Sequence, residues 1–222
     1  MMTSQFAPLR LFGPRISTYS RIASMVAEEK GAPWEIIPTD PKTVDHRQRH
    51  PYGRAPALEW TTPAGTPVRL YETIAIASFI DGQFGTPWAL SPDKPLENAA
   101  MHQWISIVDQ YMFRVIDVEF VLPAIVTRLT GQEPDDDRAR KALGPMAYMF
   151  DQVESHLQDR PYFAGTALSL ADIWMIALVD PLRLSGASLQ LIEQRPAFFN
   201  WYERLRQHPS FIATEFDLST LV

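Results

Sequence analysis

The apolar pattern of this 222-residue chain changes once, across residues 84–95. Before that stretch, apolar runs of strand length alternate with helical patterns, whereas after it apolar residues recur only at the spacing of helices. Because glycine and proline end both kinds of element, the stretch itself is predicted to be a linker. Its turn-forming residues are Gly85, Pro87, Pro92 and Pro95. The sequence therefore predicts an α/β domain at 7–83, a linker at 84–95 and an all-helical domain at 96–222.

The first domain is predicted to follow the order β-α-β-α-β-β-α. Its first helix ends at Lys30 and Gly31, a basic residue followed by glycine, which is a common helix stop. The last two strands flank the turn residues 63–66 as a hairpin, and a helix over 73–81 follows directly. Residues 41–50 are polar and are predicted to form a loose helix or a loop. The predicted strands are 9–12, 34–37, 57–60 and 68–71.

The second domain is predicted to be a helical bundle. Residues 170–184 are apolar nearly all round, so they are expected to form a central, buried helix. Pro123 is predicted to kink or end the long helix that contains it, because proline lacks a backbone donor. Ser169 and Asp172 have the spacing of a helix-capping box, and the acidic run at 135–137 is favourable charge for a helix start. A last amphipathic helix carries Phe198, Trp201, Tyr202 and Leu205.

Composition and charge argue against several classes of function. The chain has no cysteine, which removes disulfides, cysteine-ligated zinc and a thiol nucleophile of its own. A net charge of −6 argues against nucleic acid as a partner, since phosphate binding needs a basic surface. No apolar run approaches the roughly 20 residues that span a bilayer, and no secretory signal is seen, so no membrane partner and a cytoplasmic location are expected. The acidic run lacks the spacing of a metal site, and no metal is expected.

Two short segments carry the strongest functional signal. Pro56 stands at the entrance of a predicted strand, where its missing N–H leaves neighbouring backbone groups available to a peptide-like ligand. Glu72 and Thr73 open a predicted helix, and the unsatisfied N–H groups of a helix N-terminus can hold a carboxylate. Together the two segments predict a site for a small peptide with a free α-carboxylate.

Four motifs follow one another along the chain. They are a hydroxyl-rich stretch at 16–21, His-Pro-Tyr-Gly-Arg-Ala-Pro-Ala-Leu at 50–58, Tyr-Glu-Thr-Ile-Ala-Ile at 71–76 and Ser-Leu-Ala-Asp-Ile at 169–173. In this order and spacing they resemble the motifs of the glutathione S-transferase superfamily, cytosolic type, with the class left open. The resemblance implies a thioredoxin-like N-terminal domain, an all-helical C-terminal bundle domain, glutathione as co-substrate and a homodimer.

The resemblance also implies which residues hold glutathione. Thr73 would meet the α-carboxylate of the γ-glutamyl end, and Glu72 would orient the site and face the ammonium. Ala55, before an expected cis bond to Pro56, would pair with the cysteinyl part through its backbone. Arg54 is the first candidate for the glycyl carboxylate. Weaker candidates for that carboxylate are Lys42 and His46.

Activating the ligand's thiol needs a hydrogen-bond donor near a helix N-terminus. A free thiol has a pKa of about 8.5, and the thiolate is the nucleophile. Counting back from Lys30, Ser17 falls where family members with serine chemistry place theirs, and Tyr19 is the second choice. The full set of candidate hydroxyls is Ser17, Thr18, Tyr19 and Ser20.

The second substrate is expected to be a small apolar electrophile, held by aromatic, aliphatic and methionine side chains. The candidate pocket residues are Phe12, Ile16, Tyr111 and Met112. The sequence thus predicts a glutathione transferase. Two alternatives stay open, a non-catalytic binding or interaction module on the same fold and a glutathione-dependent isomerase or peroxidase.

Overall fold

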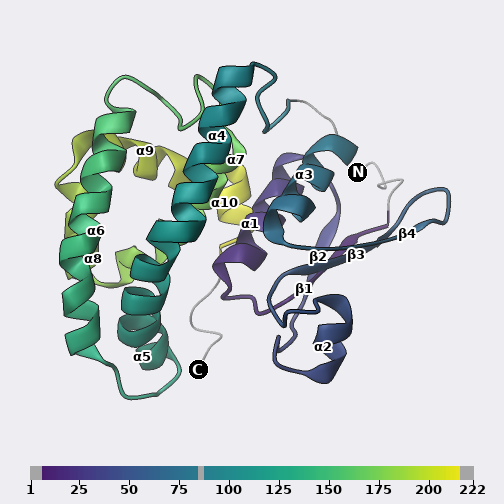
Figure 1. Cartoon of the computed structure of the whole chain (residues 1–222), viewed down its shortest axis with the longest axis horizontal. Coiled ribbons are helices and arrows are strands. Elements are labelled where there is room, and N and C mark those ends of the chain that lie inside the picture. Colours follow the sequence, from purple (N-terminus) through teal and green to yellow (C-terminus); the bar gives the residue numbers. More distant parts are fainter. Residues whose placement is uncertain (1–6, 85–87, 216–222) are drawn as a thin grey trace. The chain divides into compact units, whose positions relative to one another are not determined.

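The computed structural model describes residues 7–84 and 88–215. The chain start at 1–6, the linker residues 85–87 with the predicted turn formers Gly85 and Pro87, and residues 216–222 lie outside the described residues. Contacts divide the described chain into two compact units (Figure 1). The first unit runs to Ser91 and also takes in the segment that begins at Pro209, and the second runs from Pro92 to His208.

A mixed four-stranded sheet forms the centre of the first unit. Its order is β2-β1-β3-β4, with β1 parallel to β2 and the other neighbours antiparallel. Leu9 and Leu11 alternate with Arg10 along β1, as the period of two in a strand requires. The strands are β1 Leu9–Phe12, β2 Trp34–Ile37, β3 Ala57–Thr61 and β4 Pro67–Tyr71. All four predicted strands are confirmed, each to within one residue.

Four helices complete the first unit. Figure 1 shows α1 and α3 on one face of the sheet and α2 on the other. The helices are α1 Thr18–Glu29, α2 Val44–Arg49, α3 Thr73–Gln83 and α10 Pro209–Ala213. Helix α1 ends as predicted, with Lys30 as its C-cap and Gly31 at a φ of +60°. The predicted order β-α-β-α-β-β-α and the thioredoxin-like architecture are therefore confirmed.

Helix α10 packs against α1 although almost the whole helical unit separates them in sequence. The Arg21 guanidinium lies 4.2 Å from the centre of the Phe211 ring, and its Nη2 donates to the Phe211 carbonyl at 3.5 Å. A cation over an aromatic face in a partly desolvated position is worth about 1–2 kcal/mol. This contact joins the last described helix to the sheet unit.

The second unit is helical throughout its described elements. All ten residues of α7 are buried, which confirms the first part of the buried helix predicted over 170–184, and Asp172 closes the capping box with Ser169. The last five residues of that range instead form the 3-10 segment η3, in which Leu184 is exposed. Helix α6 begins at its N-cap Asp135, which accepts from the Arg138 amide at 3.0 Å, as the acidic run indicated. The elements after the long first helix are α6 Asp136–Leu157, α7 Leu170–Val179, η3 Asp180–Leu184, α8 Gly186–Glu193 and α9 Pro196–Arg206.

The first helix of this unit does not end at Pro123. It consists of α4 Pro95–Ile107, the π-helical segments η1 Val108–Met112 and η2 Arg114–Val126, and α5 Thr127–Leu129. In the π-helical turn the Thr127 amide donates five residues back, to Leu122. The wider turn relieves the clash that a proline ring makes with the carbonyl four residues before it. Of the two predicted outcomes at Pro123, a kink or a helix end, the end was wrong for this reason. Among the described helices, none is long and apolar enough to cross a membrane.

Candidate functional site

Three segments of the first unit converge at one end of β1. Phe12 pairs with Ala57, so the chain just beyond each strand places Gly13 beside Pro56. A Cβ on Gly13 would lie 2.6 Å from the Ser20 Oγ and 2.9 Å from the Ala55 Cβ. The start of α1, the loop after β1 and the segment before β3 therefore meet around a position that only glycine fits.

The segment before β3 has the backbone that the resemblance implies. The Ala55–Pro56 peptide bond is cis, and Pro56 directly precedes β3. Pro56 offers no N–H to the sheet, while Ala55 stays partly exposed. Its main chain is thus a candidate partner for an extended peptide.

The start of α3 lies next to this segment. Ala57 pairs with Tyr71 in the β3–β4 ladder, which brings Glu72 opposite Pro56. Glu72 has a φ of 70° and a ψ of 120°, a conformation that costs a non-glycine residue about 1–3 kcal/mol. Within the described part of the chain, the Glu72 side chain does not cap α3, so the helix N-terminus keeps N–H groups for an anion.

The four candidate hydroxyls differ in their surroundings. Ser17 is the N-cap of α1, where its Oγ accepts a 3.4 Å hydrogen bond from the Ser20 amide. Its hydroxyl proton is not used in that bond, and the side chain is partly exposed. Tyr19 is also partly exposed, whereas Thr18 and Ser20 are buried. Ser17 and Tyr19 are therefore the two accessible candidates in the first turn of α1, and Ser17 is the one at the N-cap itself.

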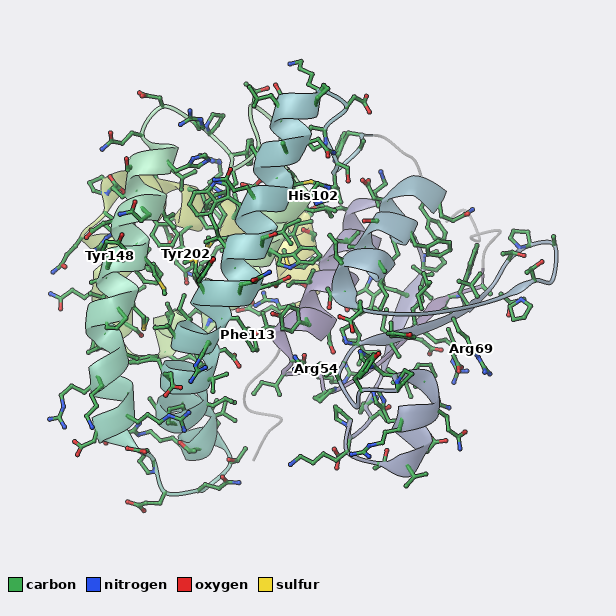
Figure 2. The ribbon with its side chains drawn as sticks, viewed as in Figure 1. Arg54, Arg69, His102, Phe113, Tyr148 and Tyr202 are labelled. Atoms are coloured by element: carbon green, nitrogen blue, oxygen red, sulfur yellow. The ribbon has the colours of Figure 1, made fainter. Side chains whose placement is uncertain are left out.

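The basic candidates separate into surface and core residues. Arg54, in the segment that joins α2 to β3 (Figure 2), and Lys42 are exposed and can reach an anion. His46 is completely buried, and its Nε2 lies 2.6 Å from the Arg54 carbonyl oxygen. The expectation that His46 faces the glycyl carboxylate was wrong, because the ring is enclosed beneath the segment that it contacts.

Sequence reasoning missed His50, which lies next to the start of α3. It is 1% exposed, and its Nε2 lies 3.7 Å from the Glu72 Oε1. Burial is the main cause that lowers the pKa of His50 below its ordinary value. The four-residue spacing of His46 and His50 was the signal that could have revealed them, since such residues share one helix face.

The four residues expected around the second substrate have different environments. Phe12 is only 3% exposed, and the Arg49 guanidinium covers its ring at 4.4 Å. Phe12 was therefore wrongly predicted as a pocket residue, since it has almost no surface to offer. Ile16 lies in the first unit, two residues before the start of α1, and its side chain is exposed.

Tyr111 and Met112 belong to the second unit. They line a cavity of about 600 Å³ between the first long helix and α6. Tyr111 is exposed and Met112 is buried. The aromatic side chains in the wall of this cavity are those of Trp104, Tyr111, Tyr148 and His156. In residues 7–84 and 88–215, no three histidine or acidic side chains are grouped as a metal site would require.

The sequence matches known proteins over nearly its whole length. It fits the family models of the glutathione S-transferase N-terminal domain at 16–83 and C-terminal domain at 116–209. It is 28% identical over 213 residues to glutathione S-transferase 3 of Zea mays, with 94% of this chain and 93% of that protein covered. It is 27% identical over 197 residues to glutathione S-transferase F14 of Arabidopsis thaliana, with 84% and 74% covered.

The fold agrees with a solved structure of the same kind. The apo form of glutathione S-transferase III superimposes with a TM-score of 0.82 and 26% identity, covering 94% of this chain and 95% of that one. Family models match the regions before and after the predicted linker, and the sheet order and helical unit are those that the resemblance implied. The chain belongs to the glutathione S-transferase superfamily.

Proposed function

We propose that the protein is a glutathione S-transferase that activates glutathione as a thiolate and transfers it to a small apolar electrophile. The observation that carries this proposal is the convergence of the first turn of α1, the cis Ala55–Pro56 segment and the start of α3 at Glu72. Its relatives bear the name glutathione S-transferase, which supports the same activity.

Each part of the tripeptide has a partner in the first unit. The γ-glutamyl carboxylate meets the Thr73 hydroxyl and the N–H groups at the start of α3, where the helix dipole favours an anion. The γ-glutamyl ammonium faces the Glu72 carboxylate. The Ala55 backbone pairs with the cysteinyl residue, and Arg54 and Lys42 are the partners for the glycyl carboxylate.

Ser17 is the residue that we assign to thiol activation. Lowering the thiol pKa by about 2 units requires the anion to be favoured by about 2.7 kcal/mol. A hydrogen bond from a hydroxyl to a charged sulfur supplies about 1.5–3 kcal/mol, and a helix N-terminus about 0.3–1 kcal/mol. The Ser17 Oγ accepts the hydrogen bond from the Ser20 amide through a lone pair, so its O–H is available to donate to the sulfur.

The chemical step is then a displacement or an addition. The thiol proton passes to solvent, and the sulfur lone pair forms the new carbon–sulfur bond. In a displacement the leaving group departs with the electron pair of its bond to carbon. In an addition the π electron pair of the acceptor moves to its far atom, which then takes a proton from solvent. Tyr111 and Met112, which line one cavity of the second unit, remain proposed contacts of the electrophile, and Ile16 remains a separate candidate in the first unit.

The family resemblance supports two further parts of the proposal, a homodimer and a cytoplasmic location. Tyr52 and Tyr71 are large exposed side chains in the first unit, and Tyr111 and Tyr148 are large exposed side chains in the second. Tyrosine is enriched where proteins meet. Sedimentation equilibrium should give twice the 25.2 kDa chain mass. A single-chain mass at micromolar concentration would contradict the dimer.

The proposed activity is tested with Ser17→Ala and its matched control Tyr19→Phe. We expect Ser17→Ala to lower kcat/KM for chloro-dinitrobenzene about 100-fold, which corresponds to about 2.7 kcal/mol. The pKa of bound glutathione, followed by ultraviolet absorbance of the thiolate, should return toward about 8.5 in that variant. Near-normal turnover in Ser17→Ala together with a loss in Tyr19→Phe would move the role to Tyr19.

A non-catalytic binding module is the second candidate. The hydrogen bond from the Ser20 amide to Ser17 is equally expected of this candidate, since a hydroxyl that only caps α1 would make the same contact. Retention on glutathione resin without turnover of several electrophiles would support this candidate over the transferase. Peroxide reduction or isomerisation in place of conjugation would instead identify a different glutathione-dependent enzyme.

A further inference from the structure

Two histidines of the first unit are buried and take no part in the chemistry proposed above. His46 lies in α2 and His50 is the C-cap of that helix, with exposed fractions of 0% and 1%. Their rings are stacked at 6.4 Å with 17° between their planes. The Nδ1 of each has no hydrogen-bond partner within the described residues. Burying two imidazoles with unpartnered Nδ1 atoms costs folding free energy. The Nε2 of each ring lies near a segment that is proposed to bind glutathione.

His46 contacts the segment that grips the cysteinyl residue. Its Nε2 lies 2.6 Å from the Arg54 carbonyl oxygen, one residue before the cis bond that follows Ala55. A carbonyl only accepts, so Nε2 carries a proton and donates it to the Arg54 carbonyl. The ring thus ties α2 to the main chain on which the tripeptide is proposed to lie.

His50 contacts the segment that grips the γ-glutamyl end. Its Nε2 lies 3.7 Å from the Glu72 Oε1, and the Tyr71 ring encloses the imidazole at 5.1 Å between centroids. Because burial lowers the pKa of His50, the ring is neutral at neutral pH. At 3.7 Å the contact is longer than a hydrogen bond, so the neutral ring limits the position of the carboxylate by packing against it and leaves the charge of Glu72 for the ligand's ammonium.

We propose that His46 and His50 are positioning residues that hold the two glutathione-binding segments at their working separation. His46 sets the Arg54–Ala55 main chain, and His50 sets the Glu72 carboxylate. Since both rings come from α2 and its cap and lie stacked, they fix the two segments relative to each other. This inference rests on the proposed glutathione site and names residues that act through it without touching the ligand.

The first test removes the His46 donor. His46→Leu keeps the volume and loses the N–H, whereas His46→Gln places an amide nitrogen where Nε2 stands. Calorimetry should show glutathione binding weakened about five- to tenfold in His46→Leu and restored to within about twofold in His46→Gln. The loss should appear in KM for glutathione, with kcat at saturating glutathione little changed. His102→Leu, an exposed histidine of the second unit, is the control and should bind as wild type.

The second test is a double-mutant cycle between His50 and Glu72. We expect His50→Leu to weaken glutathione binding about threefold in the wild-type background and to have no further effect in Glu72→Gln. The melting temperature of each variant is measured alongside its Kd. Each of three results would overturn the inference. The first is additive losses in the double-mutant cycle, and the second is an equal Kd for His46→Leu and wild type. The third is a loss of binding that follows the melting temperature and is not rescued by His46→Gln. Absence of glutathione binding by the wild type would overturn the proposed function and the inference together.

Discussion

Gly13 lies where the candidate site has no space for a side chain. A Cβ there would lie under 3 Å from both the Ser20 Oγ and the Ala55 Cβ. Gly13→Ala must push α1 away from the segment before β3, and we expect a loss of about 1–3 kcal/mol in unfolding free energy together with weaker glutathione binding. Chemical denaturation and calorimetry measure the two effects.

The matched control for that prediction is Gly82→Ala in α3. Among the residues that the structure describes, no atom beyond its own helix lies within 4 Å of a Cβ at Gly82. Alanine is the better helix former by about 1 kcal/mol, so this variant should be slightly more stable and bind glutathione normally. A Gly13→Ala protein that matched Gly82→Ala in both measurements would show that the tight contact is absent in solution.

Asp172 makes the stability of the second unit depend on pH. It accepts hydrogen bonds from the Phe163 and Ser169 amides and from the Trp201 Nε1, and burial raises its pKa from 3.8 to about 6. A raised carboxyl pKa means that the folded state holds the proton more tightly. The stabilising contribution is therefore complete below about pH 4 and is lost as pH rises through about 6.

Comparison with Asp172→Asn isolates this contribution, because asparagine does not titrate. The wild type should have the higher unfolding free energy. Its advantage over the variant should shrink by up to about 3 kcal/mol as the pH rises from 4 to 7. The NH₂ group of asparagine would also face the N–H groups that donate to Asp172, and two donors cannot bond to each other. The variant should therefore be less stable at both pH 4 and pH 7. A difference that stays constant with pH would contradict the raised pKa.

Individual side chains were the least predictable part of the candidate site. Strand alternation places Phe12 on the same face as Arg10, but the sequence pattern could not show that the Arg49 guanidinium covers the Phe12 ring. His46 was a weaker candidate for the glycyl carboxylate, and only its packing under the Arg54 segment reveals its partner. Neither the Arg49–Phe12 contact nor the His46–Arg54 contact follows from the local apolar pattern.

At the scale of elements, a buried ion pair joins α1 to α3 and to the segment after it. Lys30 Nζ lies 3.0 Å from Asp81 Oδ1 and donates to the Trp88 carbonyl at 2.6 Å. The Asp81 carboxylate also accepts from the Leu90 and Ser91 amides. Because the lysine side chain is fully buried, its removal leaves Asp81 as a buried charge without its cation.

We expect Lys30→Met to lower the unfolding free energy by about 3–5 kcal/mol. Lys94→Met is the control, since Lys94 forms an exposed pair with Glu97 that contributes at most about 1 kcal/mol. Urea denaturation of both variants measures the difference. Similar losses in the two variants would mean that the pair in the first unit is hydrated in solution.

Elements were predicted better than side chains because their signals are local. Alternating apolar residues and turn formers defined all four strands, and Lys30 with Gly31 defined the end of α1. The π-helical run through Pro123 was missed because propensity rules assume an α-helical turn. The packing of α10 on α1 was missed because no local pattern connects segments about 190 residues apart.

At the scale of the whole molecule, glutathione should stabilise one unit directly. All residues proposed to hold the tripeptide belong to the first unit. At 100 times its Kd, a ligand that binds only the folded state adds about 2.7 kcal/mol, which raises Tm by about 5–10 °C for a protein of this size. Scanning calorimetry should show this rise in the transition that includes the first unit, while glycylglycine at the same concentration causes none. A Tm unmoved by saturating glutathione would contradict the placement of the site.

The return of α10 to the sheet unit has a consequence for biosynthesis. The ribosome makes a chain from its N-terminus, and early domains often fold before later ones are translated. Here the Arg21 side chain cannot meet its Phe211 partner until residue 211 has left the exit tunnel. The thioredoxin-like part is translated first but lacks the packing of α10 on α1 at that stage. It can reach its final packing only after the helical part has emerged.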